Sequence, residues 1–148
     1  MRGTGLSRGV ASFDSGFPFF SLLSFDNANI GTSHQFPDIV GDPNAISNRT
    51  PQKWFNSDAL RVPERFTFGN AGRRGIDGPA FRNWDFSLFK QWPLGETRHL
   101  QLRAEFFNFT NHTNFAAPGA VLETAQYGRI SGTRNPGRQT QLSLKFAF

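Results

Sequence analysis

The chain of 148 residues contains no cysteine and only one methionine and one tyrosine. The absence of cysteine excludes a disulfide framework, a cysteine-ligated zinc site and a thiol nucleophile. The sequence also lacks the roughly 18 consecutive apolar residues that a membrane-spanning helix needs. Its most apolar run, Phe17 to Phe25, is interrupted by a proline and two serines. Charged residues make up only 18% of the chain, which is untypical of helix-rich soluble enzymes.

The abundant residue types favour extended structure. The chain contains 18 phenylalanines, 15 glycines and 9 prolines. Such a mixture of aromatic residues and turn formers predicts an all-β protein. The net charge is +5, but the basic residues are scattered, and the densest group is the pair Arg73 and Arg74. Because the chain has no long basic run, we expect no nucleic-acid partner.

Three segments of about ten residues alternate between apolar and polar side chains, which is the period of a β-strand. We therefore predict antiparallel strands near residues 83–92, 98–109 and 138–148, and a weaker one near 6–13. The connections 14–80 and 110–137 are rich in glycine, proline, asparagine and aspartate, and are predicted as long loops. A structureless stretch as long as 14–80 is unusual in a compact soluble domain.

Each strong strand has one apolar and one polar face. The alternation favours the C-terminal segment of a transmembrane β-barrel, because charges of both signs on the polar face suit a wet lumen better than a dry core. A soluble β-sandwich would also explain the alternation. In the barrel interpretation, the lipid-facing residues are Trp84, Phe86, Leu88, Leu100, Leu102, Ala104 and Phe106, and the lumen-facing residues are Asp85, Ser87, Gln101, Arg103, Glu105 and Lys145.

The lengths of the connections suggest an orientation. If the C-terminus is periplasmic, the short turn 93–97 is periplasmic too, and both long connections are extracellular, as is typical of outer-membrane barrels. Lys90 falls in the apolar register near a strand end, where its stem can extend toward the headgroups. A plausible hairpin register also places Asp85 close to Arg103, so we expect these two side chains to pair.

No pattern of catalytic residues emerges. His34, His99 and His112 are far apart and do not have metal-ligand spacing. Asp85 and Glu105 are the right residue types for a carboxylate pair, but Arg103 favours a structural ion pair instead. We therefore expect no enzyme, and no catalytic, cofactor-binding or metal-binding residue.

Several blocks in order along the chain resemble the C-terminal end of Oar-like TonB-dependent receptors, which are large outer-membrane barrels common in Acidobacteria. They include GLSRGVASFDSGFPF (5–19), FGNAGRRGIDGPAFRNWDFSLFK (68–90), LRAEFFNFTNHTNF (102–115) and the terminal RQTQLSLKFAF. The terminal segment also resembles the signal read by the barrel-assembly machinery, which here comprises Thr140, Leu142, Leu144, Phe146 and Phe148.

The resemblance implies a location in the cell outer membrane and energy-coupled uptake of an extracellular ligand. Such receptors have roughly 22 strands, a plug and a TonB-contact segment, so the chain is interpreted as their last four strands. The implied partners are outer-membrane lipid, the barrel-assembly machinery, TonB, and the N-terminal barrel strands and plug of the full-length receptor. The alternative from another class is a small secreted β-sandwich adhesin or carbohydrate-binding module.

Overall fold

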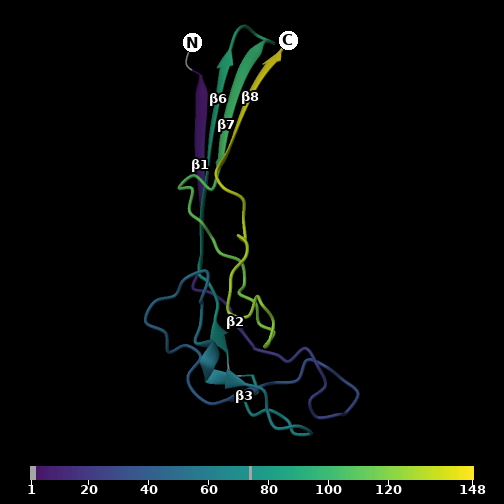
Figure 1. Cartoon of the computed structure of the whole chain (residues 1–148). Coiled ribbons are helices and arrows are strands. Elements are labelled where there is room, and N and C mark those ends of the chain that lie inside the picture. The colour runs from purple at the N-terminus through teal and green to yellow at the C-terminus, as the bar shows by residue number, and fades with distance from the viewer. Residues whose placement is uncertain (1–2, 74) are drawn as a thin grey trace. The chain divides into compact units, whose positions relative to one another are not determined.

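The structure is a computed structural model that describes residues 3–73 and 75–148 (Figure 1). In chain order, its elements are β1 (Thr4–Asp14), β2 (Pro18–Phe19), β3 (Asp38–Ile39), the 3-10 helix η1 (Ser57–Ala59), β4 (Leu60–Arg61), β5 (Ile76–Asp77), β6 (Phe81–Pro93), β7 (His99–Phe107) and β8 (Gln139–Ala147). The described part of the chain contains no α-helix, and all its paired strands within sheets are antiparallel. The predicted all-β, antiparallel fold class is confirmed.

The chain divides into two compact units. The sheet unit comprises the described residues up to Asp14, together with Phe81–Asn114 and Asn135–Phe148. The loop unit comprises Ser15–Ala80 and Phe115–Arg134.

The sheet unit contains one four-stranded sheet in the order β1-β6-β7-β8 (Figure 1). Its strands lie where the three alternating segments and the weaker strand near 6–13 were predicted, and β6 is longer than expected at both ends. β7 ends at Phe107, two residues earlier than predicted, because Asn108 adopts a left-handed conformation with φ of 49°. The sheet does not close on itself, so β1 and β8 each have one edge unpaired among the described residues.

The two ends of the sheet differ in their connections. β6 and β7 are joined by a tight turn in which the Leu94 N–H donates to the Arg98 carbonyl over 2.8 Å. Gly95 in this turn has φ of 151°, which favours glycine. The connections from β1 to β6 and from β7 to β8 leave from the opposite end of the sheet and are much longer.

Buried asparagines fix the chain at the end of the sheet with long connections. The Asn114 side chain is 1% exposed; it accepts the Arg82 N–H over 2.7 Å and donates to the Arg82 carbonyl over 2.8 Å. It therefore pairs with the backbone of β6 as another strand would. Asn108, 3% exposed, donates to the carbonyls of His112 and Pro136. These bonds satisfy buried backbone groups where regular pairing stops.

The loop unit is an organised structure, which corrects the prediction that 14–80 is a structureless loop. Phe55 and Ile76 are almost fully buried at its core, and Tyr127 packs edge-on against Phe55 with ring centroids 5.2 Å apart. Two small sheets, β2-β5 and β3-β4, frame this core. The hydrophobic core comes from residues distant in sequence, so no local periodicity revealed it.

Polar contacts lock the segments of the loop unit together. Arg49 forms an ion pair with Asp77 over 3.2 Å, and its guanidinium lies 5.8 Å from the ring centre of Trp54. The Trp54 indole donates to the Asp77 carbonyl over 2.9 Å. Buried Ser21 bonds the Tyr127 hydroxyl over 2.8 Å. The unit is therefore stabilised by side-chain contacts more than by regular strands.

Candidate functional site

In the pairing register, all residues predicted for the apolar face of β6, β7 and β8 lie on one face of the sheet. All residues predicted for the polar face lie on the other. Ser87 lies opposite Glu105, and Leu88 opposite Ala104, and directly opposed residues of antiparallel strands share a face. We name the two surfaces from these pairings. The apolar face carries Trp84, Phe86, Leu88, Leu100, Leu102, Ala104, Phe106, Thr140, Leu142, Leu144 and Phe146, and the polar face carries Asp85, Ser87, Gln101, Arg103, Glu105 and Lys145.

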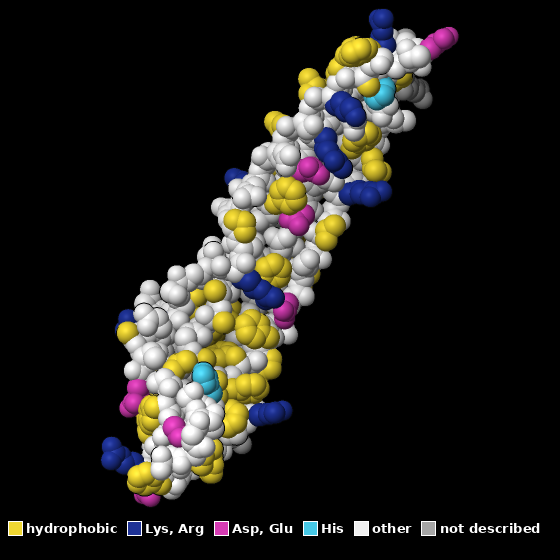
Figure 2. Space-filling model, turned by 90° about the vertical axis from the view of Figure 1, so that its right-hand side faces the viewer, with side chains coloured by type: hydrophobic (Ala, Val, Ile, Leu, Met, Phe, Trp, Pro, Cys, Tyr) yellow, Lys and Arg dark blue, Asp and Glu magenta, His cyan; other side chains and the backbone are white. Residues whose placement is uncertain are grey.

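The exposure of β6 is the reverse of what a water-soluble sheet shows. From Phe81 to Gln91, the residues of the polar face are half-buried and those of the apolar face are exposed. Leu142 and Leu144 on β8 remain 70% and 68% exposed. Figure 2 shows hydrophobic side chains at the molecular surface. In water, each large apolar side chain left exposed forgoes about 1.5–3 kcal/mol of burial energy.

β1 follows a different pattern from the other three strands. Its register places Leu6 opposite Phe89 and Val10 opposite Asp85, so both apolar side chains belong to the polar face. The residues of β1 on the apolar face are mostly small, namely Gly5, Ser7, Gly9, Ala11 and the larger Phe13. The sequence alone did not reveal this assignment, because β1 does not alternate between apolar and polar side chains as the other strands do.

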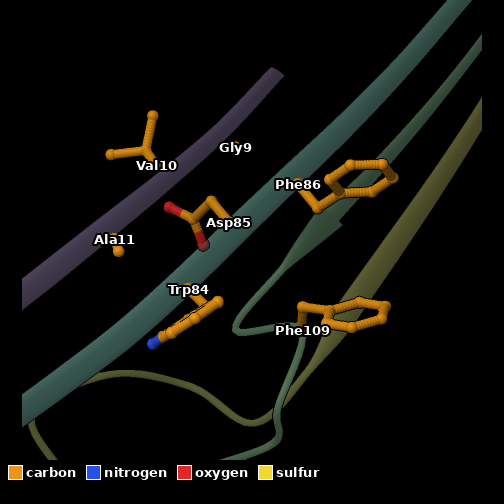
Figure 3. Close-up of a pocket in the computed structure, with 7 residues that line it drawn as sticks. All are labelled: Gly9, Val10, Ala11, Trp84, Asp85, Phe86 and Phe109. Atoms are coloured by element: carbon orange, nitrogen blue, oxygen red, sulfur yellow. The ribbon is translucent and has the colours of Figure 1, made fainter. Parts of the chain in front are cut away.

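Small residues of β1 beside large residues of β6 leave a hollow of about 420 Å³ (Figure 3). Gly9, Val10 and Ala11 line it from β1, Trp84, Asp85 and Phe86 from β6, and Phe109 from the segment after β7. A Cβ atom at Gly9 would meet only the Asp85 carbonyl oxygen at 3.8 Å, an ordinary contact. The glycine is therefore not required by close packing here.

Charged side chains of the polar face pair differently from expected. Arg103 forms an ion pair with Glu105 on the same strand, Nε to Oε1 3.5 Å. Arg103 lies opposite Phe89, four residues from Asp85, so the predicted pairing of Asp85 with Arg103 is wrong. Asp85 instead accepts hydrogen bonds from the Asn108 N–H and the Asn83 amide, both over 2.9 Å. The true register follows from the turn 94–98, which the sequence pattern did not fix.

Aromatic rings gather near the ends of the apolar face. Phe109 donates its N–H to the Trp84 carbonyl over 2.7 Å, and its ring centroid lies 5.8 Å from that of Phe106 and 6.1 Å from that of Phe86. The left-handed conformation of Asn108 brings Phe109 to these rings, although its number in a regular strand would place it on the polar face. At the turn end, the Lys90 ammonium lies 5.1 Å from the Trp92 ring centre.

The terminal segment presents an alternating apolar row. Thr140, Leu142 and Leu144 lie opposite Phe106, Ala104 and Leu102. Phe146 and Phe148 stack, with ring centroids 6.0 Å apart, and Phe148 is 92% exposed just beyond the end of β8. The five residues of the predicted assembly signal therefore lie along one edge strand, which is paired only with β7 among the described residues, and its extension.

Among residues 3–73 and 75–148, no group of three or more histidine, cysteine, aspartate or glutamate side chains is placed to hold a metal ion. No helix in the described chain is long and apolar enough to cross a membrane.

The model of a family described as outer membrane beta barrel domain matches residues 7–141. No curated protein and no solved structure matches the chain significantly. The matched range includes most of β1, all of β6 and β7, both long connections and the start of β8.

Proposed function

The chain belongs to the outer membrane beta barrel domain family and is located in the outer membrane, and from this premise we propose that it forms part of the wall of a TonB-dependent receptor of the Oar-like type. In this proposal the receptor captures an extracellular ligand and takes it up with energy transmitted through TonB. The resemblance of the sequence blocks to that family supports the receptor type. The matched family supports the barrel.

The observation that carries the wall assignment is the reversed exposure of β6. On β6 the residues of the apolar face are exposed and those of the polar face are half-buried, as expected where lipid replaces water outside and a hydrated lumen lies inside. In the proposal, the apolar face contacts lipid and the polar face lines the lumen. The Arg103–Glu105 pair then remains in a hydrated environment, where it costs little to keep charged.

The unpaired edges support a larger barrel. A barrel needs about eight strands or more, and open sheet edges are not tolerated in lipid. In the part of the chain that the structure describes, the outer edges of β1 and β8 are free in a sheet of four strands. We assign these edges to further strands of the same receptor, with a plug inside the closed barrel. A sandwich is disfavoured because every other sheet of the described residues has only two strands.

The unequal connections support an orientation. Outer-membrane barrels have short periplasmic turns and long extracellular connections. The turn 94–98 is then periplasmic, and the loop unit is extracellular. β8 ends at the periplasmic side, where its apolar row and Phe148 are accessible to the barrel-assembly machinery during insertion.

The experiment follows the native protein in cells. We expect it in the outer-membrane fraction, with an electrophoretic mobility that changes on heating as a closed barrel unfolds. Deletion of TonB should abolish ligand uptake without removing the protein from the membrane. Recovery of the native product from the periplasm or medium as a soluble protein would overturn the barrel wall. Uptake that is independent of TonB would overturn the receptor type alone.

A further inference from the structure

A buried asparagine holds an exposed turn in the loop unit. Asn27 is 7% exposed, and its side-chain amide donates to the Glu64 carbonyl over 2.8 Å and to the Thr67 carbonyl over 2.9 Å. The Asn27 carbonyl accepts the Phe66 N–H over 2.9 Å. Thr67 adds two bonds from its N–H and hydroxyl to the Glu64 carbonyl. These hydrogen bonds, and not contacts of the Phe66 side chain, therefore hold residues 64–67 in their conformation.

This turn places Phe66 in an unfavourable conformation. Its φ is 65°, in the left-handed region that glycine and asparagine tolerate and bulky residues avoid. Its side chain is 71% exposed and stacks on no other described aromatic ring. The exposed Phe66 ring thus contributes little burial free energy to folding, and the backbone conformation of this residue costs some free energy. Strain of this kind is concentrated at ligand-contact positions.

A second turn, residues 26–31, lies beside the turn that carries Phe66. Asp26 accepts hydrogen bonds from the Ile30 N–H over 3.1 Å, the Gly31 N–H over 2.7 Å and the Gln35 side chain over 2.7 Å. Desolvation acts to raise the pKa of the Asp26 carboxyl, but these hydrogen bonds outweigh it and hold the pKa below its ordinary value. Asn29 in this turn also has a positive φ of 57°. The carboxylate is therefore ionised at neutral pH.

The two turns enclose a shallow hollow of about 230 Å³. It is lined by Phe25, Asp26, Asn27, Asn29, Arg65 and Phe66. This is below the roughly 300–1,000 Å³ of pockets for drug-sized ligands, so it suits a single small ring. The lining combines exposed aromatic surface with hydrogen-bonding groups.

The charges of the hollow narrow the class of ligand. Asp26 is anionic and Arg65 is cationic, so the lining charge is balanced. Arg65 is exposed and makes no hydrogen bond or ion pair with any described residue, which leaves all its donors available. A balanced set of donors and acceptors beside an aromatic face fits a neutral ligand with many hydroxyl groups. A singly charged ligand would be attracted by one of these two side chains and repelled by the other, so its charge would bring no net advantage.

We propose that this hollow is a recognition subsite for one neutral sugar ring of an extracellular oligosaccharide, with Phe66 packing on the ring and Arg65 and Asn29 bonding its hydroxyls. The inference rests on the proposed receptor function and gives it a ligand class. Phe66 and Arg65 are specificity-determining residues of this subsite.

The test measures binding of fluorescent oligosaccharides to outer membranes that contain the native protein. The probes are maltohexaose, cellohexaose and tri-N-acetylchitotriose as neutral sugars, and trigalacturonic acid as a charged one. At least one neutral probe should bind. Phe66→Ala and Arg65→Ala should each weaken that binding by about tenfold or more. The matched controls Phe68→Ala and Arg98→Ala should leave it unchanged, since neither residue lines the hollow.

Two further variants separate contact from folding. Phe66→Gly relieves the backbone and should keep the protein in the membrane while abolishing binding, and Phe66→Trp should retain binding. Absence of binding to every neutral probe, preference for trigalacturonic acid, or full binding by Phe66→Gly would each overturn the subsite. TonB-dependent uptake of some other ligand alongside such a result would leave the receptor proposal standing, so the two failures are distinguishable.

Discussion

Adding charge to neighbouring positions of β8 should have opposite consequences on its two faces. Leu142 is on the apolar face opposite Ala104, and Gln141 is on the polar face opposite Glu105. Both lie near the middle of the nine-residue strand Gln139–Ala147. A tilted strand advances only about 2.4 Å through the bilayer per residue, so their depths are nearly equal.

The magnitudes follow from what each arginine would contact. Leu142→Arg places a charge against lipid near mid-membrane, which costs about 2–4 kcal/mol, or roughly 30- to 1,000-fold in the folding equilibrium. Gln141→Arg places the same charge opposite Glu105, where a cross-strand pair contributes about 0.2–1 kcal/mol in favour of folding. The two arginine variants should therefore differ by at least about 2 kcal/mol.

The assay is equilibrium unfolding in denaturant of the native receptor in lipid vesicles, followed by tryptophan fluorescence. Leu142→Ala and Gln141→Ala are the matched controls, because they remove the original side chains without adding charge. Equal destabilisation by the two arginines would refute the face assignment. A larger cost for Gln141→Arg would reverse it.

Three further predictions concern other parts of the molecule. Burial raises the pKa of the Tyr127 hydroxyl above its ordinary value of 10.0, and the hydrogen bond with Ser21 opposes this only partly. The stability that neutral Tyr127 contributes is therefore complete below pH 10 and is lost as the pH rises through the pKa of the folded state. The difference in tyrosinate absorbance between the native receptor and its Tyr127→Phe variant isolates this hydroxyl, and a midpoint at or below 10.0 would contradict the prediction. Asn114→Ala should cost about 1–3 kcal/mol in thermal or denaturant unfolding, since the backbone groups of Arg82 lose their buried partner, whereas exposed Asn48→Ala should cost nearly nothing. The 148-residue chain alone should aggregate without detergent because its sheet edges and apolar face are open, and a monomeric sedimentation profile with cooperative unfolding in plain buffer would count against this.

The regular part of the fold was predictable from sequence because its signal is local. Leu142 and Leu144 alternate with Gln141 and Ser143, and a period of two needs no knowledge of partners. The same reasoning placed the apolar and polar residues of β6 and β7 on opposite faces. It failed to assign β1, where Leu6 and Val10 alternate with small residues and only the pairing to β6 decides their face.

The remaining features depend on contacts between distant residues. Phe55, Ile76 and Tyr127 form the core of the loop unit, but they belong to segments with no shared period, so this unit was missed. The pairing of Asp85 with Arg103 was wrong because a hairpin register depends on turn geometry. The hollow at Phe66 was also missed, since neither a positive φ nor the bonds of buried Asn27 can be recognised from residue type.

The most direct test of the central claim uses the absence of cysteine from the chain. Single cysteines replace Gln141, Leu142, Ser143 and Leu144 in a native receptor whose cysteines elsewhere have been changed to serine. Each cysteine then carries a spin label, and the receptor is placed in lipid bilayers. Accessibility to oxygen, which concentrates in lipid, is compared with accessibility to a water-soluble nickel chelate. The barrel-wall account predicts that labels at 142 and 144 favour oxygen and labels at 141 and 143 favour the chelate. Uniform accessibility along the strand, or the opposite alternation, would contradict it.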